Sequence, residues 1–103
     1  MAVCSISVVP VGTGSTSVSS YVARCHEVLK DFEGITYQLT PMATIIEGEL
    51  DVLLRVVPEL HRATFDGGAK RLLTTLIIDD RRDKETTMKG KVASVERKLG
   101  GKV

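Results

Sequence analysis

The sequence contains no tryptophan, and aromatic side chains make up only 4% of its 103 residues. Net charge is also nearly absent, because 14 lysines and arginines are balanced by 13 aspartates and glutamates, leaving +1. A balanced charge argues against the basic surface that nucleic-acid-binding domains use to attract phosphates. We therefore expect no nucleic-acid partner.

Long apolar runs are missing as well. The longest uninterrupted runs, such as Leu76–Ile78, fall far short of the ~18 residues that a membrane-spanning helix needs. No basic segment precedes the first apolar stretch, as it would in a secretory signal. We expect a cytoplasmic protein that does not associate with membranes.

Potential metal ligands are few and scattered. Cys4 and Cys25 belong to no Cys-x-x-Cys or Cys/His spacing, so buried reduced thiols are expected, with a disulfide or a metal pair as the alternative. His26 and His61 lie far apart, and no further ligand stands at a suitable spacing from either. The sequence predicts neither a metal site nor a cofactor.

The apolar residues that are present follow two periods, which indicate an α+β fold in one domain, residues 1–103. Alternation with period two predicts four strands, over residues 2–11, 35–40, 42–48 and 70–79. Steps of three and four predict helices that start near Thr16 or Ser17, near Leu50 and near Met88. This βαββαβ order with an extra C-terminal helix is the ferredoxin-like sandwich, with a four-stranded antiparallel sheet and both long helices on one face.

The second of these helices is predicted from a stripe of apolar and small residues that continues on both sides of Pro58, where a kink is expected. The stripe comprises Leu50, Leu53, Leu54, Val57, Leu60, His61 and Thr64.

The face of the sheet opposite the helices is expected to be too apolar to be left to water. Its predicted residues are Val3, Ser5, Ser7, Val9, Thr36, Gln38, Leu73 and Thr75. A second copy of the chain would bury this face, and homo-oligomers are usually symmetric. We therefore expect a homodimer or homotetramer assembled through sheet faces, with the polar C-terminal helix bracing it.

A loop rich in glycine and hydroxyl groups connects the first strand to the first helix. Backbone amides of Gly12 and Thr13, together with the positive end of the helix, would suit an anion or a polar ring substituent. The loop is not a dinucleotide fingerprint, because Ser17 stands where the last glycine belongs, and it lacks the lysine of a phosphate-binding P-loop. A flexible capped turn is the alternative.

Charged residues cluster directly after the fourth strand. Arg81 and Arg82 lie among Asp79, Asp80 and Asp83. Arginine binds carboxylate and phosphate oxygens in a bidentate manner, so this turn is a candidate anion clamp or a set of ion pairs between subunits. A solvated surface turn is the alternative.

Thr44 and Glu47 are candidate ligand-binding residues near the end of the third strand. A carboxylate there is able to accept hydrogen bonds from an aminopyrimidine, with the hydroxyl orienting the ring. Alternatively, Glu47 begins the following helix, where a negative charge is favourable. Since no base and orienting acid accompany any serine or threonine, we do not expect an enzyme.

Three segments together resemble one family, the small thiamine-binding-like proteins: residues 9–22, 42–48 and 71–83. The resemblance covers nearly the whole chain. It implies a ferredoxin-like fold, dimers built through the sheets, commonly a tetramer, and binding of thiamine or its hydroxymethylpyrimidine part without catalysis.

The family's Thr-x-x-Glu-Gly segment matches residues 44–48, so the resemblance implies that Thr44 and Glu47 bind the pyrimidine. In this hypothesis Ser15 adds a hydrogen bond, and Tyr37 or Met42 packs against the ring. The competing hypothesis is a structural or interaction module without a small-molecule ligand.

Overall fold

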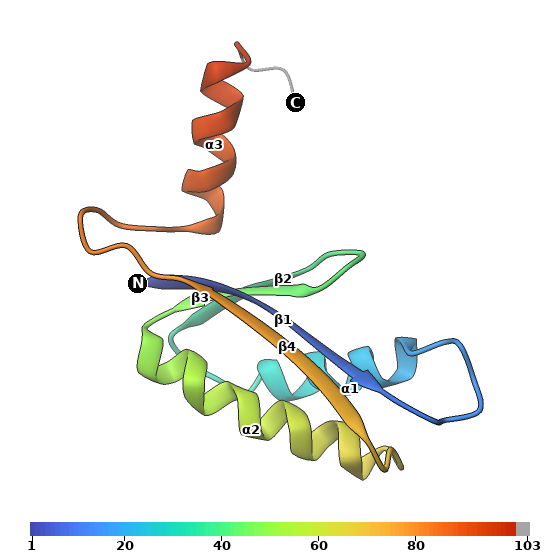
Figure 1. The fold of residues 1–103 in the computed structure, drawn as a ribbon. Helices are drawn as coiled ribbons and strands as arrows, with labels where there is room; N and C mark the ends of the chain where they lie inside the picture. The colour runs from blue at the N-terminus through green and yellow to red at the C-terminus, as the bar shows by residue number, and fades with distance from the viewer. Residues whose placement is uncertain (101–103) are drawn as a thin grey trace.

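The computed structural model describes residues 1–100 and confirms the predicted order of elements (Figure 1). The strands and helices are β1 (Ala2–Pro10), α1 (Ser19–Leu29), β2 (Ile35–Leu39), β3 (Thr44–Gly48), α2 (Leu50–Asp66), β4 (Leu72–Asp79) and α3 (Met88–Lys98).

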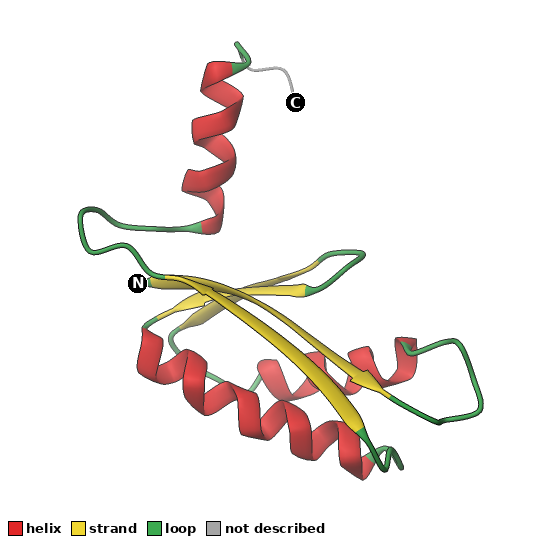
Figure 2. Ribbon diagram, in the orientation of Figure 1, coloured by secondary structure: helices red, strands yellow, loops and turns green. Residues whose placement is uncertain are grey.

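The four strands form one antiparallel sheet in the order β2-β3-β1-β4. Helices α1 and α2 lie side by side on one face of it, and the other face carries no helix along most of its length (Figure 2). This is the ferredoxin-like arrangement that the sequence predicts.

The core lies between the sheet and the two long helices. On β1, the buried side chains of Ala2, Cys4 and Ile6 alternate with side chains on the opposite face, as period two requires. They pack with apolar residues of the other elements, namely Cys25, Leu29, Ile46, Leu53, Val56 and Leu60. Burial of each large aliphatic side chain contributes about 1.5–3 kcal/mol to stability.

Helix α1 begins at Ser19, later than the predicted start at Thr16 or Ser17. The hydroxyls before it serve the loop instead, because Ser15 Oγ accepts a hydrogen bond from the Ser17 amide at 3.1 Å. The residue that precedes the helix is Val18, whose side chain makes no capping bond. The sequence therefore contains more hydroxyls suited to capping than the helix uses.

Helix α2 buries a slightly different stripe from the predicted one. Its buried residues are Leu53, Val56, Leu60 and Thr64. The assignment of Leu54 to this stripe was wrong, because that side chain is 48% exposed, whereas Val56 was missed. The helix continues through Pro58 to Asp66.

The face of the sheet opposite the helices has the predicted composition, and it is uncovered except near Val3, which is buried (7% exposed). On β1, this face carries Val3, Ser5, Ser7 and Val9, which alternate with the core residues. Their partners in register on β4 are, in the same order, Asp79, Ile77, Thr75 and Leu73. Leu73 is 65% exposed and Ile77, which the sequence analysis did not include, is 63% exposed. Ile45 and Glu47 of β3 share this face. We call these residues the open face.

Helix α3 stands apart from the two-layer body and extends it to a length of 46 Å (Figure 1). None of its residues is buried, and Val92, Val95 and Leu99 are each more than half exposed. Contacts with the sheet lie near its start, where Lys91 pairs with Asp79. None of the helices within residues 1–100 is long and apolar enough to cross a membrane.

Candidate functional site

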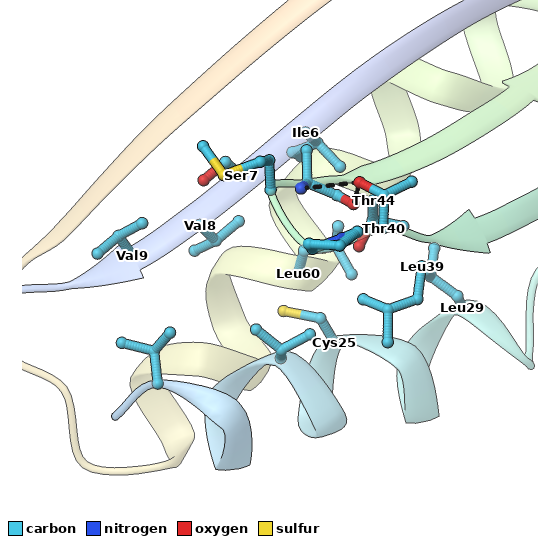
Figure 3. Close-up of a pocket in the computed structure, with 15 residues that line it drawn as sticks. Ile6, Ser7, Val8, Val9, Cys25, Leu29, Leu39, Thr40, Thr44 and Leu60 are labelled. Atoms are coloured by element: carbon cyan, nitrogen blue, oxygen red, sulfur yellow. Dashed lines mark hydrogen bonds between the residues drawn. The ribbon is translucent and has the colours of Figure 1, made fainter. Parts of the chain in front are cut away.

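A cavity of about 160 Å³ lies between α1 and the sheet, close to the turn that joins β2 and β3 (Figure 3). Most of its wall is apolar; α1 contributes Val22, Cys25 and Leu29, and Val18 lines it just before the helix. Strand β1, the β2–β3 turn and Leu60 of α2 complete the wall. A space of this size accommodates one six-membered ring, since an apolar cavity of about 150 Å³ binds benzene.

Thr44 supplies a buried hydroxyl to the wall of this cavity. Its Oγ1 lies 3.0 Å from Nε2 of His26 on α1, at hydrogen-bonding distance. The His26 ring also meets the ring of Tyr37 edge-on, with 5.6 Å between the centroids. Partial burial lowers the pKa of His26 below its ordinary value of 6.5, which favours the neutral imidazole.

The β2–β3 turn forms the rim of the cavity. Thr40 closes this turn, because its hydroxyl donates to the Ala43 carbonyl at 2.7 Å and accepts from the Ala43 amide at 3.2 Å. These bonds also explain why β3 begins at Thr44 and not at residue 42 as predicted. Met42 lines the cavity although the residue is 88% exposed, so its side chain is available to a ligand at the rim.

The cavity reaches the core at Cys25. Its Sγ lies 3.4 Å from Oγ1 of Thr64, whose hydroxyl donates to the Leu60 carbonyl at 2.9 Å. Cys25 and Cys4 are both buried and carry free thiols, as the sequence predicts. Burial raises the pKa of the Cys4 thiol, which keeps it protonated and unreactive.

Glu47 lies on the open face and not in the cavity. Its side chain reaches the start of α3, where Oε2 accepts a hydrogen bond from the Met88 amide at 2.7 Å. A carboxylate at this point satisfies an unpaired helix amide and interacts favourably with the helix dipole. The alternative that placed Glu47 at the start of the following helix, α2, was wrong, because α2 begins at Leu50 and the helix start that Glu47 contacts is that of α3.

The loop between β1 and α1 lies at the surface. Gly12 and Gly14 have φ of 78° and 79°, a backbone region that favours glycine. Thr13 and Ser15 bond to each other within the loop, and neither lines the cavity. The loop leads to the cavity only at Val18.

The two arginines of the charged turn pair with aspartates of the same turn. Arg81 Nε donates to Asp83 at 2.8 Å, and Arg82 pairs with Asp80 at 2.9 Å. These pairs lie beside the start of α3, away from the cavity residues. A role of Arg81 or Arg82 in binding anions or a second subunit stays a prediction.

The structure thus brings together three of the five predicted ligand-binding residues. Thr44 and Met42 line the cavity, and Tyr37 supports it through His26. Ser15 and Glu47 lie elsewhere. From the sequence, His26 was weighed only as a metal ligand. Its position next to Cys25, on the apolar stripe of α1, was the signal that could have placed it near the cavity. Within residues 1–100, no three potential metal ligands come together.

Comparison with known proteins identifies relatives along almost the entire chain. The family model described as thiamine-binding protein matches residues 4–96. YqgV of Bacillus subtilis is 45% identical over 102 residues, which cover 96% of this chain and 98% of YqgV. A protein of Methanothermobacter thermautotrophicus is 43% identical over 100 residues, covering 96% of this chain and all (100%) of the relative.

Solved structures agree with the fold. The protein MJ1052 of Methanocaldococcus jannaschii superposes with a TM-score of 0.82 at 33% identity, over 98% of this chain and 97% of that one. A Thermotoga maritima protein, whose name proposes a role in thiamine biosynthesis or salvage, has a TM-score of 0.76 at 29% identity, over 91% and 97% of the two chains. The fold and the matched sequence together place this chain in the thiamine-binding protein family.

Proposed function

We propose that this chain binds thiamine or its hydroxymethylpyrimidine part without catalysing a reaction, and that the pyrimidine ring occupies the cavity beneath α1. The observation that carries the proposal is a largely apolar cavity of about 160 Å³ with the buried Thr44 hydroxyl in its wall. Such sites bind a flat ring through apolar contact and use few polar groups to orient it. The family and the Thermotoga relative support the choice of ligand.

Within this proposal the predicted residues take distinct roles. Thr44 hydrogen-bonds the ring, Met42 packs over it at the rim, and Tyr37 holds His26 against Thr44. Ser15 and Glu47 do not line the cavity, so we assign neither of them to the ring. The Thr44 hydroxyl contacts a base, His26, but no carboxylate pairs with His26 to orient it among residues 1–100, so we favour binding over turnover.

We further propose that the protein is a cytoplasmic homodimer or homotetramer in which the open face is covered by a second copy. Leu73 and Ile77 on this face are 65% and 63% exposed, which is unusual for aliphatic side chains on a strand. The exposed apolar residues of α3 next to this face would extend the contact.

The open face and the exposed helix α3 also support the second candidate, an interaction module without a small-molecule ligand. A large uncovered sheet face and an unpacked helix suit a partner protein whether or not the cavity is used. The two candidates differ in one respect, which is whether a small molecule stabilises the fold.

Thermal unfolding with and without ligand tests the proposal. Hydroxymethylpyrimidine and thiamine at one hundred times the dissociation constant should stabilise the fold by about 2.7 kcal/mol, which raises the melting temperature measurably. Nucleotides serve as unrelated ligands and should have no effect. If thiamine, its phosphates and hydroxymethylpyrimidine all leave the melting temperature unchanged, the proposed ligands are rejected and the interaction module is favoured.

A cavity-filling variant locates the site. Val22→Phe places a ring in the cavity and should abolish calorimetric binding, because Val22 lines the wall. Val28→Phe is the matched control, since Val28 is also half-buried on α1 but lies outside the cavity. Equal affinity of the two variants for hydroxymethylpyrimidine would place the ligand elsewhere.

A further inference from the structure

His26 and Thr44 form a polar pair in an otherwise apolar region. Thr44 faces the cavity, whereas His26 lies behind it and lines an outer groove with Ser19, Val22, Ala23, Leu39, Thr40 and Pro41. The 3.0 Å contact between Nε2 and Oγ1 therefore connects the outer groove to the cavity wall. Among the described residues of the proposed site, Thr44 is the one that forms a hydrogen bond with the His26 ring.

The proton of the Thr44 hydroxyl has two possible positions in this pair. A hydroxyl donates one hydrogen bond and accepts two, and a neutral imidazole nitrogen either donates or accepts. If Nε2 accepts, the Thr44 proton points at His26 and the oxygen lone pairs remain for the cavity. If Nε2 donates, the Thr44 proton must find another acceptor.

Burial decides between the two arrangements. Thr44 is only 8% exposed, and His26 is the hydrogen-bond partner of its hydroxyl within residues 1–100. An unpaired buried donor is rarer in proteins than an acceptor with an unused lone pair. The arrangement in which Nε2 accepts leaves no buried proton unpaired, so the ligand-free protein should adopt it.

We propose that His26 is a positioning residue that determines the ligand specificity of the cavity: by accepting the Thr44 proton at Nε2, it makes Thr44 an acceptor toward the ligand. The cavity would then select a ring that carries a hydrogen-bond donor at this point, such as an amino group, over the same ring with an oxo group. This inference rests on the proposed function, and it adds a residue and a selection rule to it.

The surroundings of His26 favour the neutral form that this role requires. The groove that His26 lines contains no other charged or titratable side chain, and Tyr37 is the titratable group that faces the ring from β2. On α1, Glu27 and Lys30 pair with each other, and the side chain of Arg24 lies beside Gly67. The lowered pKa of His26, caused by burial, agrees with this geometry.

The first test uses the unaltered protein without ligand. The ¹⁵N chemical shift of His26 Nε2, measured well above pH 6.5, should be that of an unprotonated nitrogen, and a His61→Gln variant assigns the signals of the two histidines. The shift of a protonated Nε2 would overturn the inference. Because no ligand is present, this result does not depend on the proposed function.

The second test compares calorimetric affinities for hydroxymethylpyrimidine and its oxo analogue. The unaltered protein should prefer the amino compound by about fivefold, the factor that corresponds to one neutral hydrogen bond. His26→Phe keeps an aromatic ring beside Tyr37 but releases the Thr44 proton, so the preference should disappear while binding of either ring persists. In a Thr44→Val background, His26→Phe should cause no further change in the preference.

The outcomes separate the two proposals. If the unaltered protein binds neither compound, the proposed function fails. If it binds the amino compound and His26→Phe retains the full preference, the inference about His26 fails and the proposed function stands. A variant that unfolds, detected by circular dichroism, leaves the chemical-shift measurement as the deciding result.

Discussion

Thr44 and Glu47 belong to the same short strand, β3, but lie on opposite faces of the sheet. Thr44 pairs with Ile6 on the helix-covered face, whereas Glu47 pairs with Val3 on the open face. Successive side chains of a strand point to alternate faces, so residues separated by an odd number of positions are always divided in this way. Within one protomer, the sheet itself lies between the two side chains, so a ring in the cavity would contact Thr44 but not Glu47.

Replacing Glu47 by alanine tests this separation. Glu47→Ala removes the acceptor of the Met88 amide, and loss of a helix-capping interaction typically costs about 0.5–2 kcal/mol. We expect faster amide hydrogen exchange at the start of α3 and an unchanged calorimetric affinity for hydroxymethylpyrimidine. Thr36→Ala, at the neighbouring position on β2, is the control for the open face. Loss of ligand affinity in the glutamate variant alone would return Glu47 to the binding site.

The periodicity of the sequence was sufficient to predict the fold. Alternation on β1 assigned Cys4 and Ile6 to the core and Ser5 and Ser7 to the open face, and the strand register agrees. The same rule, applied to β3, would have separated Thr44 from Glu47. The resemblance treated them as one motif, and motif spacing contains no information about which face a side chain occupies.

The contacts that define the site were beyond prediction because they join distant parts of the chain. His26 and Thr44 are separated by 18 positions and meet only after α1 packs on the sheet. Likewise, the contact between Glu47 and Met88 depends on where the charged turn places α3, and 41 positions separate the two residues. Local helix and strand propensities determine neither of these two contacts.

Assembly through the open face predicts a specific effect of Ile77→Asp. This change places a charge where Ile77 is 63% exposed in one protomer, so the fold of the protomer should survive, whereas burial of an unpaired charge between two sheets is strongly unfavourable. We expect light scattering to report an oligomer for the unaltered chain and a monomer for the variant. Leu54→Asp, at a residue 48% exposed on α2, should leave the mass unchanged. A monomeric unaltered protein at micromolar concentration would contradict the proposed assembly.

Gly48 is predicted to be sensitive to the addition of a single methyl group. A Cβ at this position would lie 3.0 Å from the Gly34 carbonyl oxygen and 3.1 Å from Cγ2 of Ile35, where β2 and β3 pair. Overpacking of this kind costs about 1–3 kcal/mol, so Gly48→Ala should lower the free energy of unfolding in urea by that amount. Ala43→Gly, in the turn at the other end of the β2–β3 pair, is a control for a change of one methyl group. An unchanged midpoint for Gly48→Ala would show that the two strands separate easily.

The lowered pKa of His26 predicts how stability depends on pH. In the unfolded chain His26 gains its proton near pH 6.5, but burial holds its pKa below that value in the folded protein. Between these two pKa values the unfolded state binds more protons, so the free energy of unfolding rises with pH in this window and falls as the pH drops below 6.5.

His26→Phe removes this contribution, and above pH 6.5 it should also cost about 0.5–1.5 kcal/mol through the lost bond to Thr44. Urea unfolding at a series of pH values should therefore show the difference between the two proteins shrinking toward acid pH. A difference that grows on acidification would mean that the folded protein binds the His26 proton more tightly than the unfolded chain.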